Sequence, residues 1–251
     1  MINTIRAEFW KLRTILAHWA LVVIALAFPL VIVTLVSLLA DFGSEPRSDE
    51  IASLVVGLTV VSAMVLGAMS TISLTGDYSH NTIRPTYAAT PDRWRVIAAK
   101  ISVNSSLVAV VSAIAVFGSW LISSVILAAR GDSISIGDDE VLATLISAIA
   151  LAVIVSLFGF GLGLIIRNSP VTVTVLLLWP LLIESLIGVV LNLIGWGGAT
   201  TWLPYQAAIG AVADGSADTD QLGRPLGLVY FALVSLALIA IGGVLDQRRD
   251  A

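Results

Sequence analysis

Residues 141–166 read VLATLISAIALAVIVSLFGFGLGLII, a run of 26 residues without a charged side chain. An α-helix rises 1.5 Å per residue, so about 20 apolar residues cross the ~30 Å hydrocarbon layer of a bilayer. A buried helix of a water-soluble protein could account for one such run. The chain has six of them, and the sequence therefore predicts an all-α membrane protein.

The six predicted spans are separated by polar connections or by connections marked with glycine and proline. They cover about residues 19–40, 51–75, 101–128, 141–166, 171–194 and 225–245 of a single transmembrane domain, residues 1–251. Composition agrees, because 12% of the residues are charged and a soluble domain carries roughly 25%. We expect no cleaved signal peptide, since the first run is too long for one and no small-x-small site ends it.

Lysine and arginine residues predict the orientation, because they remain on the cytoplasmic side of a membrane. With the N-terminus inside, ten of the 13 basic residues lie inside, namely Arg6, Lys11, Arg13, Arg84, Arg93, Arg95, Lys100, Arg167, Arg248 and Arg249. The other three, Arg47, Arg130 and Arg224, lie outside. Most acids show the opposite pattern, with Asp41, Glu45, Asp49, Glu50, Asp132, Asp138, Asp139, Glu140, Asp214, Asp218 and Asp220 outside. We expect a multi-pass protein of the cell (inner or plasma) membrane with both termini in the cytoplasm.

Residues 1–18 predict an amphipathic helix before the first span. The apolar residues recur at steps of three and four and form one stripe, Ile2, Ile5, Phe9, Leu12 and Leu16, with Trp10 beside it. Such a helix lies in the membrane interface. The alternative is a merely polar leader.

Catalytic and metal-binding motifs are missing from the sequence. There is no cysteine, and neither lysine, Lys11 nor Lys100, follows the glycine that a phosphate-binding P-loop requires. His18 and His80 lack the spacing of metal ligands. No nucleophile with a base, and no pair of acids, lies within the spans. We therefore expect no enzyme activity, and no cofactor or metal bound by this chain.

Glu184 is the one ionisable residue deep within a predicted span. An acid at that depth costs roughly 2.5–3.5 kcal/mol on insertion scales, so it faces protein or water. Pro180, one turn earlier, predicts a kink. Either Glu184 lines a translocation route or hinge, with Trp179 and Asn192 as further route candidates, or a protonated carboxyl bonds a neighbouring helix for assembly. One acid in six spans argues against an ion-coupled transporter.

Two glycines of the fourth span, Gly159 and Gly163, are spaced four residues apart. They resemble a nucleotide-binding fingerprint only superficially, because they lie inside an apolar span. The spacing instead indicates close packing against another helix in the membrane.

The loop after the second span reads NTIRPTYAATPDRWRVIAAK over residues 81–100. Asn81 or Thr82 is expected to cap a short helix that tolerates Pro85 in its first turn. Thr90 and Pro91 are expected to end this helix and to supply the cap and first position of the next one. Asp92, Arg93, Arg95 and Lys100 then open the third span, the acid at the positive helix end and the bases at the headgroups.

This region resembles the permease subunits of type-2 ATP-binding-cassette (ABC) exporters. Members show an acid ending the second span, Gly-Thr, a short apolar helix, Thr-Pro, Arg, and Ala/Gly-Lys opening the third span. The matching residues are Asp77, Thr82, Thr90, Pro91, Arg93, Ala99 and Lys100, with Asp77 where Glu is common and Asn81 where Gly is common. Elsewhere, Phe9–Arg13 resembles the family's membrane-parallel helix, and Trp202–Pro204 its short re-entrant extracellular helices between spans five and six.

The resemblance implies that residues 82–90 form a coupling helix, within the cytoplasmic loop 76–100, that docks on a separate ABC ATPase. The coupling residues it implies are Asp77, Thr82, Arg84, Tyr87, Thr90, Pro91, Arg93 and Lys100. It further implies two ATPase copies that bind ATP and Mg²⁺, a second permease subunit, identical or related, and membrane lipid, but no nucleic acid.

Cargo is expected to be hydrophobic or amphipathic (a drug, antibiotic, lipid or peptide), because the spans offer few polar groups. Two other functions remain open from the residues alone. An ATP-independent carrier or channel would transport without an ATPase, and a non-transporting membrane scaffold would show no cargo-dependent ATPase stimulation.

Overall fold

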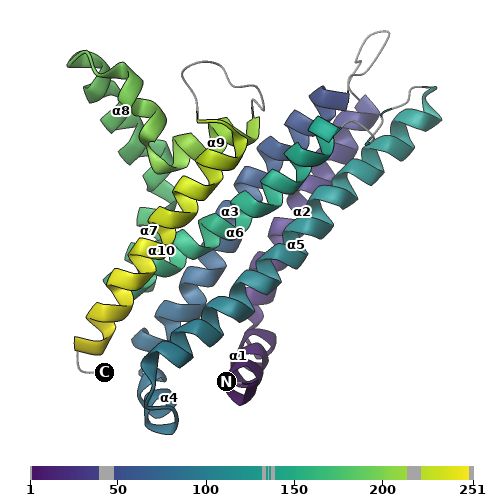
Figure 1. Cartoon of the computed structure of the whole chain (residues 1–251). Coiled ribbons are helices and arrows are strands. Elements are labelled where there is room, and N and C mark those ends of the chain that lie inside the picture. The colour runs from purple at the N-terminus through teal and green to yellow at the C-terminus, as the bar shows by residue number, and fades with distance from the viewer. Residues whose placement is uncertain are drawn as a thin grey trace.

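The computed structural model describes residues 2–39, 48–131, 134, 136, 139–213 and 222–248. All regular secondary structure within these ranges is helical (Figure 1). The elements are α1 (Ile2–Thr14), α2 (Leu16–Leu39), α3 (Ser48–Ser79), α4 (Ile83–Ala89), α5 (Arg93–Ala129), α6 (Asp139–Ile166), α7 (Ser169–Leu178), the π-helical turn η1 (Trp179–Ile183), α8 (Glu184–Leu193), the 3-10 turn η2 (Gly197–Trp202), α9 (Pro204–Ala213) and α10 (Arg224–Arg248).

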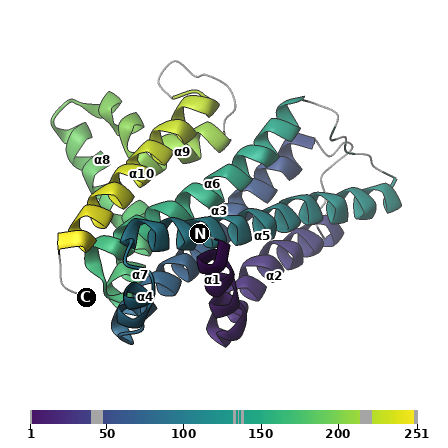
Figure 2. The same cartoon turned by 60° about the horizontal axis from the view of Figure 1, so that its bottom comes forward.

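Six helical stretches of the described chain are long and apolar enough to cross a membrane, which confirms the six predicted spans. They are Leu16–Leu39, Glu50–Ser79, Arg93–Ala129, Glu140–Ile166, Ser169–Leu193 and Pro225–Arg248. The fifth consists of α7, η1 and α8 in succession. Both chain ends lie at the end of the bundle that carries α1 and α4 (Figures 1 and 2).

Several helices extend beyond the apolar runs that predict them. The third span begins at Arg93 and not near residue 101, because the Asp92 side chain accepts the backbone N–H of Arg95 and so caps the helix there. The prediction that Thr90 caps this helix is therefore wrong. The first span begins at Leu16, so the N-terminal helix ends at Thr14, earlier than expected.

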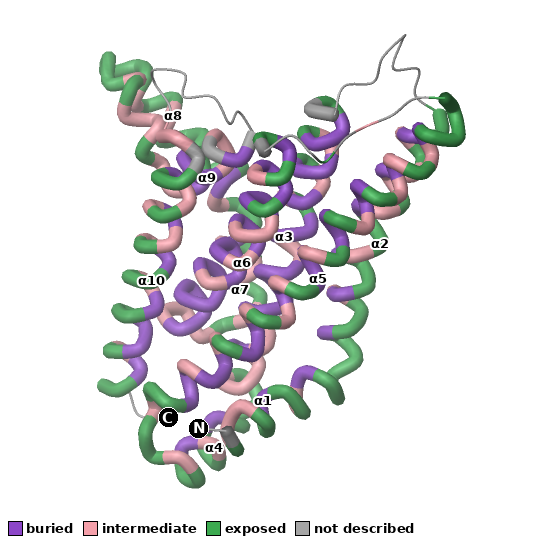
Figure 3. The backbone as a smooth tube through the Cα atoms, turned by 45° about the vertical axis from the view of Figure 1, so that its right-hand side comes forward, coloured by how far each residue is buried: buried purple, intermediate pink, exposed green. Residues whose placement is uncertain are grey.

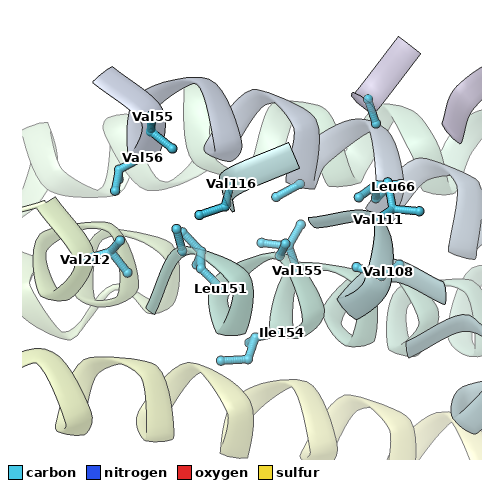
Figure 4. Close-up of a cluster of buried hydrophobic side chains, with 14 of the residues drawn as sticks. Val55, Val56, Leu66, Val108, Val111, Val116, Leu151, Ile154, Val155 and Val212 are labelled. Atoms are coloured by element: carbon cyan, nitrogen blue, oxygen red, sulfur yellow. The ribbon is translucent and has the colours of Figure 1, made fainter. Parts of the chain in front are cut away.

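The core is centred on α3, α5 and α6, with further side chains from α2, α7, α9 and α10, and it consists mainly of β-branched and leucine residues (Figure 4). Hydroxyl pairs join the helices within it. Ser70 of α3 and Ser156 of α6 lie 2.7 Å apart, and Ser37 of α2 and Ser123 of α5 lie 3.0 Å apart. Such pairs hold helices together where lipid provides no hydrophobic driving force.

Helix α6 is so close to its neighbours that only glycine fits at the contacts. A Cβ atom on Gly159 would lie 2.6 Å from the Thr71 hydroxyl and 3.1 Å from the carbonyl oxygen of Gly67, both in α3. A Cβ atom on Gly161 would lie 2.8 Å from the Cβ of Leu238 in α10. A Cβ atom on Gly163 would lie 3.2 Å from the side chains of Leu74 and Thr75 in α3, so the packing role predicted for Gly159 and Gly163 agrees with this geometry, whereas the contact at Gly161 was not predicted.

The outer faces of α2, α8 and α10 are apolar and exposed, as expected for surfaces that meet lipid or a second subunit (Figure 3). Many residues assigned to the outside lie outside the described residues, namely Asp41, Glu45, Arg47, Asp132, Asp138, Asp214, Asp218 and Asp220. Arg249, which was assigned to the inside, is also not among the described residues. The re-entrant position of η2 and α9, and the interfacial position of α1, stay predictions.

We expect Gly159→Val to lower the stability of the purified protein by about 1–3 kcal/mol, because the added side chain forces α3 and α6 apart. Thermal unfolding in detergent measures the loss. Gly57→Val is the matched control, since Gly57 lies in α3 with no atom within 4 Å of an added Cβ. Equal melting temperatures for the two variants would contradict the close packing.

Candidate functional site

Helix α4 is a short helix between α3 and α5 at the end of the bundle where both chain ends lie (Figure 2). The turn before it depends on Asn81, whose backbone is left-handed (φ 56°). Thr82 occupies the N-cap position but caps nothing, and its hydroxyl instead donates to Asp77 Oδ1 at 2.7 Å. The predicted capping bond from Asn81 or Thr82 is thus absent from the described loop.

The two faces of α4 differ. Ile83 and Tyr87 are buried and pack with Val96 of α5. Arg84 and Pro85 are exposed on the outer side. The helix is therefore attached to the bundle along one face and open to a partner along the other.

Asp246, near the end of α10, is fully buried (0% exposed) and organises the contacts beneath α4. Its carboxylate accepts hydrogen bonds from Tyr78 at 2.6 Å and from Tyr87 at 2.8 Å. Arg167 forms an ion pair with it at 2.5 Å. Arg93 donates to its backbone carbonyl and lies 3.9 Å from its carboxylate. We call these five residues the Asp246 cluster.

Cation–π contacts complete this cluster. The Arg93 guanidinium lies 5.0 Å from the ring centre of Tyr87, and that of Arg167 lies 4.8 Å from the ring centre of Tyr78. Burial raises the pKa of the Tyr87 phenol, and the bond to Asp246 adds to this effect. The phenol therefore stays protonated and remains a hydrogen-bond donor.

Arg167 reaches the cluster from the connection between α6 and α7. Its backbone is left-handed (φ 57°), a conformation that usually falls to glycine after a helix. The turn directs its side chain back toward α10. The Asp246 cluster thus joins α3, α4, α5, the α6–α7 connection and α10.

A second charge cluster surrounds Lys100 of α5, whose side chain is 1% exposed. Its ammonium donates to Asp77 at 2.5 Å and to Glu8 of α1 at 2.6 Å. Lys11 contacts the same two acids at 3.3 and 3.1 Å. The four residues form the Lys100 cluster, with two charges of each sign.

The charge on Lys11 is stabilised within this cluster. Burial alone would lower the pKa of Lys11, but the carboxylates of Glu8 and Asp77 outweigh it and raise that pKa above its ordinary value. Because Asp77 also accepts from Thr82, the start of α4 is connected to the Lys100 cluster. Tyr87 connects the body of α4 to the Asp246 cluster, so α4 is fixed at two points.

Glu184 lies within the fifth span, directly after the π-helical turn η1, which contains Pro180 and interrupts that span. Its carboxylate is 1% exposed and accepts the backbone N–H groups of Tyr205 and Gln206 at 2.8 and 2.9 Å. Trp179 Nε1 donates to it at 2.9 Å. All three bonds run toward the carboxylate, so none requires a proton on Glu184.

Tyr205 and Gln206 belong to the first turn of α9, whose N–H groups have no partner inside the helix. Glu184 satisfies two of them and places a negative group at the positive end of α9. Burial raises the pKa of the Tyr205 phenol, with Glu184 nearby as a further cause. The structure therefore makes Glu184 an anchor for α9.

A cavity of about 510 Å³ adjoins Glu184 between α8, η2 and α9. Ser185, Asn192, Thr200 and Gln206 also line it. Two of the three route candidates, Glu184 and Asn192, therefore border one cavity. The third, Trp179, packs its ring against Phe158 at 5.4 Å.

Comparison with known families gives one match that spans most of the chain. The family model described as ABC-2 family transporter protein matches residues 4–194, which run from α1 to the end of α8. The chain belongs to the ABC-2 transporter family. A comparison with curated proteins gives no match.

An ABC-2 permease is the membrane component of a transporter and is not itself catalytic, and this membership implies an ABC ATPase as partner in general. The matched segment contains all of the Lys100 cluster. Asp246 lies beyond the matched segment, so the family match gives no information on the contacts that Asp246 makes beneath α4.

The predicted coupling residues of the ABC-2 permease fall into three groups. The structure brings Asp77, Thr82 and Lys100 together in or beside the Lys100 cluster, and Tyr87 and Arg93 together in the Asp246 cluster. Arg84 is exposed, and Thr90 and Pro91 form the turn between α4 and α5. Tyr87 faces the bundle, so it holds α4 and does not present a surface to a partner.

The predicted apolar stripe of α1 is partly buried and partly exposed. Leu12 is buried against the bundle and Ile5 is half-buried, whereas Phe9 and Trp10 are exposed. Sequence reasoning missed Glu8, Tyr78, Arg167 and Asp246 as site residues. Two of them left a signal: Glu8 interrupts an amphipathic helix on its inner side, and Asp246 falls inside the last turn of an apolar span.

We expect Asp246→Asn to destabilise the protein by about 1.5–3 kcal/mol, because it removes the charge of a buried carboxylate that accepts two tyrosine hydrogen bonds and pairs with two half-buried guanidinium groups. Thermal unfolding and chymotryptic cleavage after Tyr87, which is buried in the folded protein, should both report the release of α4. Asp92→Asn is the matched control, since Asp92 is half exposed and asparagine also caps helices. Cleavage at the wild-type rate in Asp246→Asn would show that α4 is held by other contacts.

We expect Glu184→Gln to release α9, because the amide offers one acceptor oxygen in place of two and carries no charge. The chain has no cysteine, so Ala207→Cys supplies a single thiol at a buried position of α9. Maleimide labelling of this thiol should become several-fold faster in Glu184→Gln and should not change in the control Ser185→Ala. An unchanged labelling rate in Glu184→Gln would show that Glu184 does not hold α9 in place.

Proposed function

We propose that the chain is the transmembrane subunit of an ABC exporter. Two permease subunits, identical or related, flank a central route. Two copies of a separate ABC ATPase bind the exposed face of α4 and hold the ATP and Mg²⁺, and both termini of the permease face the cytoplasm of the cell. The observation that carries the proposal is α4 itself: a short helix fixed to the bundle at two points with its outer face exposed.

The Asp246 cluster supports a coupling role for α4. A partner that moves α4 also moves Tyr87, and with it a carboxylate that is bonded to three further segments. These contacts resist separation, because the fully buried Asp246 carboxylate would be left as an unpaired charge. Displacement of α4 is therefore passed to α3, α5 and α10 as a body.

The cavity beside Glu184 supports a route on the outer side. It combines hydroxyl and amide groups with apolar residues, which suits an amphipathic cargo. Asn192 and Glu184 both line it. The Glu184 carboxylate, however, already accepts hydrogen bonds from α9 and from the Trp179 indole. We propose Asn192 as the cargo-facing residue of the three, and the other two as its support.

We expect Arg84→Glu and Tyr87→Phe to fail in different ways. Arg84→Glu reverses the charge of the docking face and should abolish co-purification with the ATPase. Tyr87→Phe keeps that face but removes the bond to Asp246, so the ATPase should bind while cargo moved per ATP falls several-fold. Both are measured in proteoliposomes containing permease and ATPase.

Arg248→Glu is the matched control for charge at the same end of the bundle, since Arg248 is exposed on α10. Transport by the permease alone, without ATPase, would favour a carrier or channel. ATPase binding with no cargo-dependent stimulation would favour a scaffold.

A further inference from the structure

An apolar cavity of about 880 Å³ lies between α1, α2 and α5, away from the Asp246 cluster and Glu184. This volume lies within the ~300–1,000 Å³ of pockets that enclose small molecules. Its lining is mainly apolar: Ile5, Phe9, Leu12, Trp19, Val22, Val103, Leu107 and Val110. An opening toward the lipid is expected, because Phe9, Trp19 and Val110 are exposed.

The cavity extends along α5 from Ser102 to Val110. At 1.5 Å per residue this is about 12 Å. One leaflet contributes about half of the ~30 Å hydrocarbon layer. The cavity therefore has the depth of one acyl chain in a single leaflet, with α1 across its headgroup end.

The polar groups at that end are basic. Arg6 and Arg13 line the cavity, and its described lining contains no acidic residue. The Arg13 guanidinium lies over the Trp10 ring, and the Trp19 indole donates to the Arg13 carbonyl at 3.0 Å. These contacts fix the rim in position.

His18 gives an independent indication of a ligand. It lines the cavity, it is 3% exposed, and its Nδ1 has no hydrogen-bond partner among the described residues. A buried polar atom without a partner is costly, so such an atom in a native protein calls for an explanation. His18 lines the same cavity as Arg6 and Arg13.

We propose that this cavity is a binding site for one anionic phospholipid. An acyl chain lies along α5 between Phe9 and Val103, and the phosphate and headgroup lie between Arg6 and Arg13. A zwitterionic lipid offers the same chain but weaker charge complementarity. The site goes beyond the proposed function and does not depend on an ATPase or on cargo.

Occupancy would affect the coupling end of the bundle. Helix α1 forms one wall of the cavity with Leu12 and supplies Glu8 and Lys11 to the Lys100 cluster on its other side. A lipid in the cavity therefore holds α1 against α5 while Glu8 holds Lys100. The lipid composition of the membrane would therefore affect the position of Asp77, and through its bond to Thr82 the start of α4.

The test is native mass spectrometry of the purified full chain, titrated with phosphatidylglycerol or phosphatidylcholine of identical acyl chains. We expect one phosphatidylglycerol to bind roughly tenfold or more tightly than phosphatidylcholine, since each basic residue near an anionic headgroup contributes severalfold. Replacing both arginines (Arg6→Gln with Arg13→Gln) should reduce this preference to less than threefold. Ser106→Trp, at an exposed position of the lining, should weaken binding of both lipids at least tenfold.

Two controls accompany these variants. Arg248→Gln removes an exposed basic residue at the same end of the bundle, and Ser124→Trp adds the same bulk to α5 outside the cavity. Both should bind lipid as the wild type does, and circular dichroism should show equal helix content in all variants. Equal affinity of the wild type for the two lipids would indicate annular lipid only and overturn the proposal. So would unchanged lipid binding in Ser106→Trp, or a dimer that dissociates in Ser106→Trp while lipid remains bound, since the cavity would then be a contact between two copies.

Discussion

The carboxylate of Asp246 is the interaction on which the α4 end of the structure depends. A charge removed from water is stable in protein only when ion pairs and hydrogen bonds replace its hydration. Two tyrosines and two arginines from four other segments provide that replacement. These contacts connect α3, α4, α5 and the α6–α7 connection to α10 at one carboxylate. A short helix that would not be stable alone becomes a rigid part of the bundle.

Hydropathy predicted all six spans, because the bilayer requires about 20 apolar residues in each one whatever their partners. It placed the ends poorly, as at Arg93, since a helix can continue into the aqueous region once Asp92 caps it. The composition of the α4 loop predicted a short helix, but not which face it buries. Tyr87 was predicted as a coupling residue by resemblance, and its bond to Asp246, 159 residues away, is visible only in the structure.

The partners of the buried charges could not be predicted, because they are distant in the sequence. Periodicity and capping are local, whereas Lys100 meets Glu8 across 92 residues and Arg167 meets Asp246 across 79. Glu184 illustrates the limit in another way. Its depth in a span predicted a functional or structural acid, but the choice between them required the first turn of α9, which lies 21 residues further on in a segment without regular pattern.

The order of Asp246 in the chain has a consequence for biosynthesis. Every residue that it bonds is translated earlier, and Tyr87 precedes it by 159 positions. At the ~5–20 residues per second of translation, about 8–30 s separate the two. During that interval α4 lacks its bond to Asp246, whereas Thr82 and Asp77, which form its other attachment, have already been synthesised. The attachment of α4 to α10 is therefore completed only after the sixth span has been synthesised, so an incomplete chain cannot hold α4 as the full chain does.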